Sequence, residues 1–375
     1  MDEPHTPKKF KYQKDARLSW YRSKIDKDVM RQLMKTSDWQ GLKQCGLQWG
    51  LFFTTGTLAY LAYLNVDMTN WFWSVPLVLL ALFVHGTFMP FMGYVSVHEL
   101  SHKTPFKTKS LNEFFLYAYG FLTWADPVWF RPSHVKHHQV TVHTNLDGEV
   151  ELPMKLNFDK AFWRNALFFN PDLLKYNLNV FLQFARGELH GEWHQFVMPE
   201  EDKRLRRLHR NYARFVLIGH LCLFTFFLLS GLWFLVFLVT LPHAYCNWLG
   251  VLCGTPQHYG MRPNVSDFRL CCRTYTCSRF VGFLYWNMQY HIEHHMFPAV
   301  PFFNLPKLRK AIEHDLPPAP HGLLATWKHI LDIHRKSIAN PDYIFTPVLP
   351  TNSKESTTLV DDHVLESEAS ALSVT

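Results

Sequence analysis

The sequence predicts an all-α membrane protein in which four transmembrane helices carry a cytosolic helical cap with a histidine-rich di-metal site. Two observations lead to this prediction. The chain of 375 residues contains several long stretches without a charged side chain, and a membrane-spanning helix needs about 20 apolar residues. In addition, eight of the 22 histidines fall in three short clusters, each with the spacing that places side chains on one face of a helix.

Four segments are predicted to cross the membrane, at about residues 46–66, 71–97, 212–231 and 232–254. The first two contain no Asp, Glu, Lys or Arg. Residues 215–257 also contain none, and this run is long enough for two helices that turn at Ser230 and Gly231. Buried core helices of a soluble protein are the alternative, but four uncharged segments of this length are rare in soluble domains.

Lysines and arginines predict how these spans are oriented. The first 45 residues are strongly basic and residues 202–210 read "DKRLRRLHR", whereas the loop at 65–70 has neither Lys nor Arg. Short loops rich in Lys and Arg stay in the cytosol. We therefore expect a multi-pass integral membrane protein with a cytosolic catalytic side, located in the endoplasmic reticulum if the cell is eukaryotic. The net charge of +7 then reflects this bias and contact with the lipid bilayer, and predicts no nucleic acid partner.

This organisation divides the chain into three regions. A basic cytosolic segment, residues 1–45, precedes a membrane domain at residues 46–345. The first 45 residues lack an apolar core, so we expect no cleavable signal peptide. The last region, residues 346–375, is polar and is predicted to be a disordered tail.

The three histidine clusters predict a metal site. Residues i, i+3 and i+4 share one face of a helix, and neutral imidazole is a common ligand of iron, zinc and copper. The predicted topology places all three clusters on one side of the membrane. The clusters are "HELSH" with His98 and His102, "HVKHH" with His134, His137 and His138, and "HIEHH" with His291, His294 and His295.

Two other metal sites can be weighed against a site built from all the clusters. "HELSH" satisfies the zinc protease pattern H-E-x-x-H, with Glu99 as general base, and would suggest intramembrane proteolysis. That hypothesis leaves the six remaining clustered histidines without a role. Soluble di-iron bundles use four glutamates and paired E-x-x-H motifs, but Glu99 and His102 form one such motif without a clear second. An all-nitrogen site for two metal ions accounts for every cluster.

With these motifs in view, the sequence resembles the membrane fatty acid desaturase and hydroxylase superfamily. The resemblance rests on "HELSHKTPF", "RPSHVKHHQVTVHTNLDGE" and "NMQYHIEHHMFPAVPFFNLPKLRKAI", which flank the predicted spans in that order and cover residues 30–345 by order of elements. In detail, "TPQHYGMRP" and "YHIEHHMFP" are most similar to the branch of small-substrate oxygenases that includes rhizopine oxygenase-like proteins.

The resemblance implies a non-heme centre of two iron ions that uses O2 to oxidise an unactivated C–H bond. Two electrons must come from outside, because no nucleotide-binding fingerprint such as G-x-G-x-x-G occurs in the chain. The implied electron donor is cytochrome b5 or a ferredoxin with its reductase. Desaturation of a lipid or acyl chain is the expected reaction. The alternative is a hydroxylase or oxidative demethylase of a small non-lipid metabolite.

A ninth metal ligand, His258 in "TPQHYG", follows from the same resemblance. Stearoyl-type relatives have a further metal-binding histidine between the second and third clusters, and His258 matches it best. It also directly follows the uncharged run, so we expect it at the membrane depth of the other histidines. His243 is the rival, but it lies about 20 Å deeper if one helix continues at about 1.5 Å per residue.

Carboxylates often accept the second N–H of a metal-bound histidine. The tentative candidates for this role are Glu99, Asp147, Glu149, Asp267 and Glu293. No catalytic residue separate from the metal ligands is expected.

Some histidines and all cysteines are expected to stay outside the metal site. His143 falls off the helical face of its cluster, and the pair His190 and His194 has polar flanks and no adjoining span. The seven cysteines include "CCRTYTC" at residues 271–277, whose spacing matches no common zinc motif, so they are predicted to be free thiols.

Overall fold

The computed structural model describes residues 12, 16, 18–152, 154 and 156–351, and in this part of the chain it is helical, with β structure limited to two isolated bridges. The predicted all-α class is therefore confirmed. The α-helices are α1 (Lys27–Leu33), α2 (Asp38–Leu64), α3 (Trp71–Pro90), α4 (Ser96–Ser101), α5 (Lys109–Thr123), α6 (Pro127–Val140), α7 (Lys160–Leu167), α8 (Pro171–Arg186), α9 (Gly191–Val197), α10 (Lys203–Leu229), α11 (Trp248–Gly254), α12 (Phe268–Cys271), α13 (Arg279–Leu284), α14 (His291–Met296), α15 (Leu305–Ile312) and α16 (Gly322–Ala339). Short 3-10 or π turns are η1 (Phe91–Val95), η2 (Val236–Thr240), η3 (Pro242–Ala244), η4 (Thr255–Gln257), η5 (Phe302–Asn304) and η6 (Glu313–Asp315).

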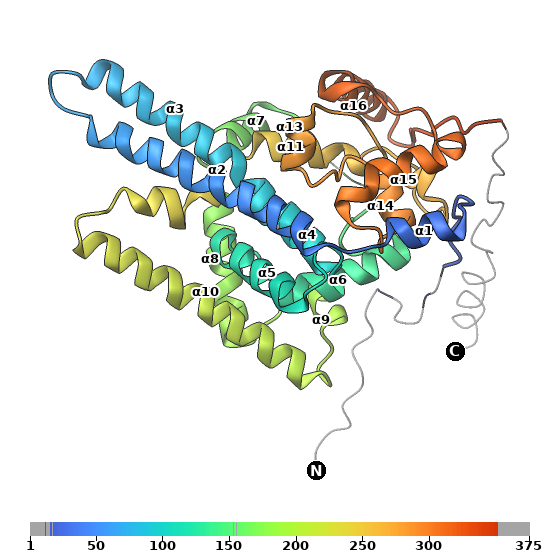
Figure 1. Ribbon diagram of the computed structural model, residues 1–375, viewed down its shortest axis with the longest axis horizontal. Helices are drawn as coiled ribbons and strands as arrows, with labels where there is room; N and C mark the ends of the chain where they lie inside the picture. Colours follow the sequence, from blue (N-terminus) through green and yellow to red (C-terminus); the bar gives the residue numbers. More distant parts are fainter. Residues whose placement is uncertain (1–11, 13–15, 17, 153, 155, 352–375) are drawn as a thin grey trace, which may run out of the picture.

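Helices α2 and α3 form a long hairpin that projects from the rest of the molecule (Figure 1). The connecting turn is held by Asp67, whose carboxylate accepts from the backbone N–H and hydroxyl of Thr69, while the Asn70 amide donates to the Asn65 carbonyl. Such local hydrogen bonds favour a turn over continued helix. The hairpin therefore begins and ends where the sequence changes from apolar to polar.

One helix connects this hairpin to the histidines. Helix α3 runs through η1 into α4, so that residues 71–101 form one continuous helix. Pro90 lacks the N–H that an α-helix needs, and the π turn η1 follows directly after it. Such turns inside α-helices are rare and often lie at functional sites. Here the turn sets the direction of α4, at whose end His98 and His102 lie.

The second half of the predicted apolar run does not form one helix. Helix α10 covers the third predicted span, but residues 232–254 are broken into η2, η3 and α11, so the prediction of a fourth continuous transmembrane helix is wrong. Pro242 cannot donate a backbone hydrogen bond, and Cys246 adopts a left-handed backbone with φ 59°. The break brings Tyr245 against α3 at Gly86, where any side chain would collide with the tyrosine ring.

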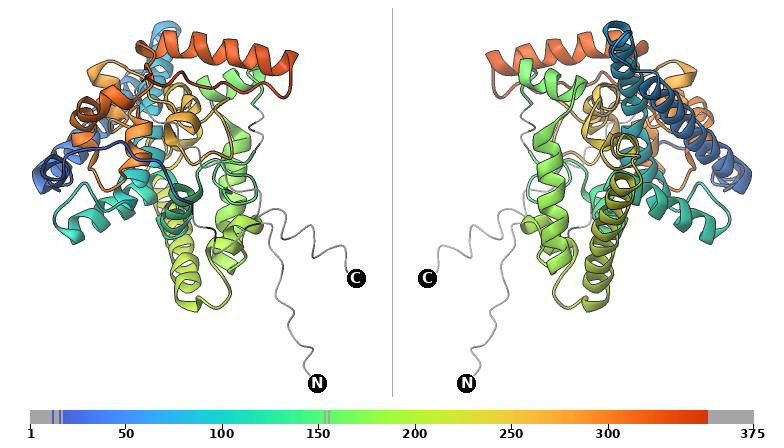
Figure 2. Two further views of the ribbon diagram at one scale, coloured as in Figure 1. Left: turned by 90° about the vertical axis from the view of Figure 1, so that its right-hand side faces the viewer. Right: turned by 90° about the vertical axis from the view of Figure 1, so that its left-hand side faces the viewer.

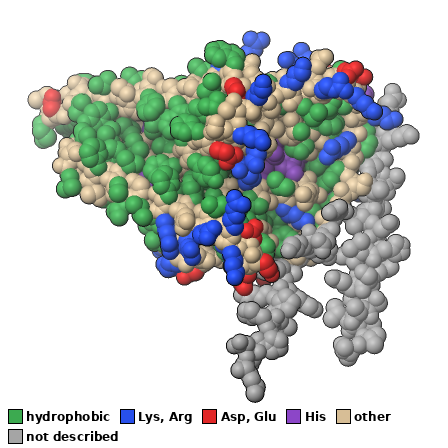
Figure 3. All heavy atoms as spheres, turned by 60° about the horizontal axis from the view of Figure 1, so that its bottom comes forward, with side chains coloured by type: hydrophobic (Ala, Val, Ile, Leu, Met, Phe, Trp, Pro, Cys, Tyr) green, Lys and Arg blue, Asp and Glu red, His purple; other side chains and the backbone are tan. Residues whose placement is uncertain are grey.

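Two helices are long and apolar enough to cross a membrane by length and composition, Trp71–Ser101 and Lys203–Leu229. Only 39% and 28% of their most apolar stretches are buried, whereas the core helix of a soluble protein would be mostly buried. Figure 3 shows hydrophobic side chains gathered on one half of the visible face and Lys and Arg side chains on the other half, with histidine visible among them. Exposed apolar surface of this extent marks contact with lipid or another protein.

Apart from α2, α3 and α10, the helices form a cap at one end of the hairpin, and α16 crosses one edge of it in the side views (Figure 2). The N-terminal segment closes this cap. Trp20 stacks on Phe268 with ring centroids 3.9 Å apart, and its indole N–H donates to the Gln139 carbonyl. Phe268 in turn faces the ring of His295 at 5.4 Å. The segment therefore shields one side of the histidine site from water.

A buried arginine helps to hold the N-terminal segment against the cap. The fully buried Arg269 guanidinium donates to Asp267 at 2.7 Å and to Asp315 at 2.7 Å. Asp315 also accepts from the hydroxyls of Tyr21 and Ser23. This geometry corrects the expectation that Asp267 supports a metal-binding histidine, because both of its carboxylate oxygens face Arg269.

Two predicted regional boundaries can be compared with the structure. Helix α2 begins at Asp38, so the predicted boundary at residue 45 falls inside a helix, because the serine cap and not the last charge determines where the helix starts. Ser37 accepts from the Gln40 backbone N–H at that cap. The predicted disordered tail lies outside the described residues from position 352 onward.

The buried ion pairs generate a stability prediction. Replacing Arg269 by Ala leaves Asp267 and Asp315 buried without their cation, and breaking a buried pair in this way costs about 3–5 kcal/mol. We expect a clearly lower thermal unfolding midpoint for the purified protein in detergent. Arg31→Ala is the matched control, because Arg31 and Asp28 form an ion pair whose side chains are both 75% exposed. Equal midpoints for the two variants would contradict this account.

Candidate metal centre

Four separate elements carry the predicted ligand histidines to one place. The end of α4 provides His98 and His102, α6 provides the second cluster, and α14 provides the third. His258 follows directly after η4. Helix α6 begins at Pro127, with Asp126 accepting from the backbone N–H groups of Val128 and Trp129, the usual way to start a helix. The second cluster therefore lies on a helix whose start and direction are well defined.

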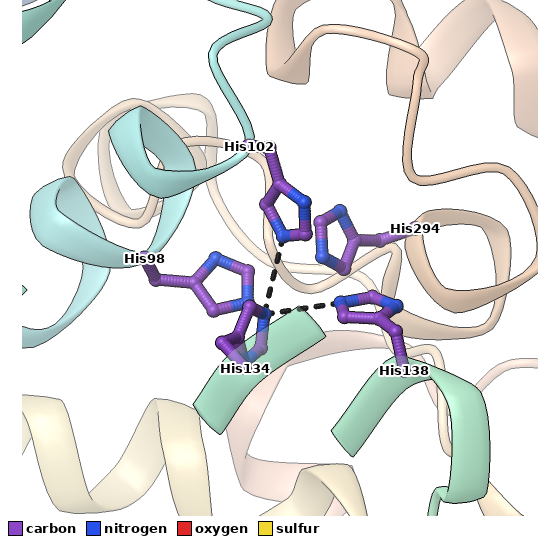
Figure 4. A group of neighbouring side chains, drawn as sticks. All are labelled: His98, His102, His134, His138 and His294. Carbon is purple, nitrogen blue, oxygen red and sulfur yellow. Dashed lines mark hydrogen bonds between the residues drawn. The ribbon is translucent and has the colours of Figure 1, made fainter. Parts of the chain in front are cut away.

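Five imidazoles form a first group, shown in Figure 4: His98, His102, His134, His138 and His294, each with a ring nitrogen within 4.8 Å of the others. The Nε2 atom of His134 lies 3.1 Å from Nε2 of His102 and 3.0 Å from Nε2 of His138. Two nitrogens bound to one ion at about 2.1 Å and at right angles would lie about 3 Å apart. The spacing of the group therefore fits one metal ion.

A second group adjoins the first. Its members are His258, His291 and His295, together with the thiol of Cys272, all within 4.8 Å of one another and all buried. The Nε2 atom of His291 lies 2.9 Å from Nε2 of His258 and 3.1 Å from Nε2 of His295. The structure thus brings His258 to the third histidine cluster, although 33 residues separate it from His291.

The two groups are in contact. The rings of His138 and His295 stack with centroids 4.2 Å apart. His137 belongs to neither group by ligand-atom distance, but its ring lies 5.0 Å from that of His295 and 5.4 Å from that of His258. The structure therefore places His137 beside the second group.

Three of the predicted carboxylates lie behind the histidines. Asp147 accepts from Nδ1 of His137 at 2.8 Å, and Glu149 lies 2.8 Å from Nδ1 of His134. Glu99 lies 3.1 Å from Nδ1 of its neighbour His98. Partners of this kind fix the tautomer and orientation of a metal-binding histidine.

Glu293 does not have this role, which corrects the expectation. Its carboxylate accepts from the Thr274 hydroxyl and pairs with Arg309 at 3.1 Å. Glu293 is two residues after His291, and residues two apart on a helix do not share a face. The spacing within "HIEHH" already contains this information.

Sequence reasoning missed two further partners. Nδ1 of His258 donates to the backbone carbonyl of Cys271 at 3.0 Å, and Nδ1 of His295 lies 3.2 Å from the Thr141 hydroxyl. A backbone carbonyl leaves no signal in a sequence. The sequence did contain a signal for Thr141, because this residue lies four positions after His137 and therefore on the same side of the helix.

These partners determine which nitrogens remain free. A neutral imidazole carries one proton, and in His134, His137 and His258 the Nδ1 atom uses it toward Glu149, Asp147 and the Cys271 carbonyl. The Nε2 atoms of His134 and His258, whose rings are neutral, are therefore unprotonated. In the first group, Nε2 of His98 and of His294 are buried without a hydrogen-bond partner among the described residues. Buried polar atoms of this kind are costly unless something binds them, which is the environment a metal ion would satisfy.

Burial also keeps most of the rings neutral. Desolvation and neighbouring histidines lower the pKa of His102 to about 3, and desolvation and His137 lower the pKa of His258 to about 3. The pKa values of His134, His138, His291, His294 and His295 lie well below the usual value for the same reasons. His137 differs: burial lowers its pKa, but the carboxylates of Asp147 and Glu149 outweigh this and raise it to about 9. Neutral imidazole is the form that binds metal.

The other histidines stay apart from both groups. His143 packs edge-on against Trp20, and His194 stacks on Trp129 with ring centroids 4.0 Å apart. His190 lies beside His194 at 6.1 Å. His243, the rival to His258, lies against Trp124 at 5.6 Å.

A cleft of about 740 Å³ reaches the site at His258. Much of its lining comes from the end of α16 and from four apolar side chains, Leu152, Met154, Leu156 and Met261. This volume lies within the range of about 300–1,000 Å³ that small-molecule sites occupy. The cleft therefore offers a route between solvent and the back of one ligand histidine.

Long apolar helices thus lead into groups of histidines that could hold metal. The chain belongs to the fatty acid desaturase family, whose model matches residues 75–327. The match begins in α3 and ends in α16, so it includes every histidine of both groups. The predicted resemblance to this superfamily is confirmed.

Individual relatives are distant. The chain is 25% identical to the Delta(6)-fatty-acid desaturase fat-3 of Caenorhabditis elegans over 58% of this chain and 54% of the relative. It is 22% identical to a sphingolipid delta(4)-desaturase of Komagataella phaffii over 79% and 78% of the two chains. A putative sphingolipid delta(4)-desaturase/C4-monooxygenase of Caenorhabditis elegans is 24% identical over 62% and 58%. The chain thus spans little more than half the length of the two nematode relatives.

The two groups generate a prediction about metal content. We expect two equivalents of metal per chain in the purified protein, and about one equivalent after His258→Ala, because the second group then loses a buried imidazole that faces His291. His243→Ala is the control, since it also removes a buried histidine but not one of either group. Elemental analysis measures both. Full metal content in His258→Ala with loss in His243→Ala would show that the wrong histidine was assigned.

Proposed function

We propose that this protein is a membrane di-iron oxidoreductase that uses O2 and two external electrons to desaturate a lipid or acyl chain. One observation carries the proposal: two adjoining groups of buried or half-buried imidazoles, each with its donor atoms within 4.8 Å of one another. Nitrogen donors alone, in this number, exceed what one ion can bind. Imidazole suits iron, and carboxylates stand behind the rings instead of binding metal themselves.

The residues that would hold the two irons follow from the geometry. The first group would hold one ion, and His258, His291 and His295, with His137 beside them, would hold the other. When bound, the two irons supply the activation of O2 toward a C–H bond. Desaturation removes two hydrogens from the substrate, and reduction of O2 to two waters then needs two more electrons and two protons. The external donor provides these electrons.

The chain's own residues prepare the site. Glu149 and the Cys271 carbonyl hold protons at Nδ1 of His134 and His258, so the Nε2 atoms of these two rings remain free to bind, and Asp147 orients His137. Burial of the rings excludes water, which otherwise would compete for the metal positions and react with intermediates. A preorganised site of this kind needs little rearrangement when metal binds.

The geometry gives no support to an H-E-x-x-H protease. In such an enzyme Glu99 would act as base toward a metal-bound water. Here its carboxylate lies 3.1 Å from Nδ1 of His98 and 3.7 Å from Nδ1 of His294. These nitrogens face away from the centre of the group, so Glu99 orients ligands.

The cleft supports an apolar substrate. Its lining includes Leu152, Met154, Leu156, Met261 and Ile344, which suit an acyl chain better than a polar metabolite. The relatives are named as fatty-acid and sphingolipid desaturases. Hydroxylation is the second candidate, because one relative's name joins desaturase with C4-monooxygenase, and the same hydrogen abstraction can end in an alcohol. Oxidative demethylation of a small metabolite would begin with the same hydroxylation.

The electron donor is proposed to be cytochrome b5 or a ferredoxin with its reductase. An acidic carrier would be attracted to basic surface near the site. Lys203, Arg204 and Arg207 are exposed at the start of α10, and Figure 3 shows Lys and Arg gathered on the half of the molecule that contains the histidines. The same residues would lie at the anionic cytosolic headgroups.

A topology test follows from the proposed orientation. We expect a reporter inserted after Ser230 to lie outside the cytosol and one inserted at residue 350 to lie in the cytosol, because Lys and Arg concentrate on the histidine side. A third reporter at Asp67, in the turn of the α2–α3 hairpin, should agree with the first. Reporters at Ser230 and residue 350 on the same side would contradict the orientation.

Product analysis tests the reaction. After expression in a host that supplies a reductase, we expect mass spectrometry to find lipid or acyl products two mass units lighter than their precursors. His294→Ala should abolish them, because His294 belongs to the first group. His190→Ala is the matched control and should retain activity, since His190 is part of neither group. Products sixteen units heavier would identify a hydroxylase instead.

A further inference from the structure

The second histidine group contains a residue that is not a histidine. Cys272 is fully buried, and its thiol lies within 4.8 Å of the ligand nitrogens of His258, His291 and His295. No other cysteine among the described residues belongs to either group. Donor atoms on opposite sides of one ion, with metal–sulfur and metal–nitrogen bonds of about 2.3 and 2.1 Å, lie about 4.4 Å apart. The thiol therefore belongs to the same group of potential ligands as the three imidazoles.

The backbone around Cys272 is held on both sides. The Cys272 backbone N–H donates to the Phe268 carbonyl at 2.9 Å, and the Arg273 N–H donates to the Gln257 carbonyl at 2.8 Å. The second bond ties the segment to the residue just before His258. The Cys271 carbonyl also accepts from Nδ1 of His258. One dipeptide thus orients His258 through its backbone and presents a thiol to the same group.

The two groups also differ in their donors. The first group has five imidazoles, whereas the second has three within ligand distance of one another, with His137 beside them. The thiol therefore belongs to the group that has fewer nitrogen donors. Cysteine binds metal as thiolate, a soft anionic ligand that differs from neutral imidazole in charge and covalency.

We propose that Cys272 is a thiolate ligand of the second metal ion, which makes the two metal positions chemically distinct. The inference rests on the proposed two-metal centre. On binding, the S–H bond breaks, the proton leaves to solvent and a sulfur–metal bond forms, with no change in oxidation state. The negative charge of the thiolate reduces the net positive charge of the second ion relative to the first.

Cobalt(II) is a suitable probe, because a thiolate bound to it absorbs in the near ultraviolet and imidazole ligands do not produce this band. The wild-type protein is produced with Co2+ in place of iron, purified in detergent and examined by absorption spectroscopy and elemental analysis. We expect two cobalt ions per chain and the thiolate band. Cys272→Ser should lose the band almost completely while the cobalt of the first group remains.

Cys271→Ser is the matched control. It makes the same change one residue earlier, at a thiol whose sulfur lies 3.9 Å from that of Cys272 but outside the metal group. Its backbone carbonyl, which holds His258, is unchanged. We expect this variant to keep both cobalt ions and the full band.

The outcomes separate this inference from the proposed function. Two cobalt ions without a thiolate band in the wild type would overturn the ligand role of Cys272 and leave the two-metal centre standing. Retention of the band in Cys272→Ser would also overturn it. Absence of bound metal in the wild type would overturn both proposals. If Cys272→Ser fails to fold, the wild type and Cys271→Ser decide: the band must be present in both.

Discussion

The convergence of unprotonated imidazole nitrogens in a dry interior is the constraint on which the rest of this structure depends. Nitrogens about 3 Å apart, such as those of His102, His134 and His138, gain little from one another and lose their contact with water. The arrangement persists because five of the rings, those of His98, His134, His137, His258 and His295, are also held from behind by a carboxylate, a hydroxyl or a backbone carbonyl. Because these partners accept hydrogen bonds from Nδ1, the Nε2 lone pairs point inward. A site assembled in this way is costly without an ion and favourable with one.

The long apolar helices and the cap together position the ligand histidines. The α2–α3 hairpin leads into α4 through the π turn after Pro90, so the apolar helix that can cross a membrane is continuous with the first histidine cluster. On the opposite side, residues 20–23 are tied to Arg269 and Asp315, and this network holds Phe268 over His295. The helices therefore set the depth and direction of the ligands, whereas the buried ion pairs close the cap over them. This division explains why Asp267, a candidate to support a ligand, is used for structure instead.

The proposed ligands give the two metal positions different chemistry. Five neutral imidazoles surround the first position, and the second combines imidazoles with the thiol of Cys272. His137, which lies beside the second group, is the ring whose pKa is raised by the carboxylates of Asp147 and Glu149. The cleft reaches the back of His258, one member of the second group.

The sequence by itself determined the helical class, the histidine clusters and the family, because helical spacing and uncharged length are local properties of the chain. It also identified Glu99, Asp147 and Glu149 by their proximity to those clusters. Only the tertiary structure decided the rest. The fourth predicted span is broken at Pro242 and Cys246, and hydropathy records composition but not backbone geometry. Asp267 and Glu293 pair with Arg269 and Arg309 instead of with the ligands they were expected to support. The grouping of His258 with His291, the carbonyl behind it and the thiol of Cys272 in front all depend on long-range contacts and on backbone atoms, for which no local pattern exists.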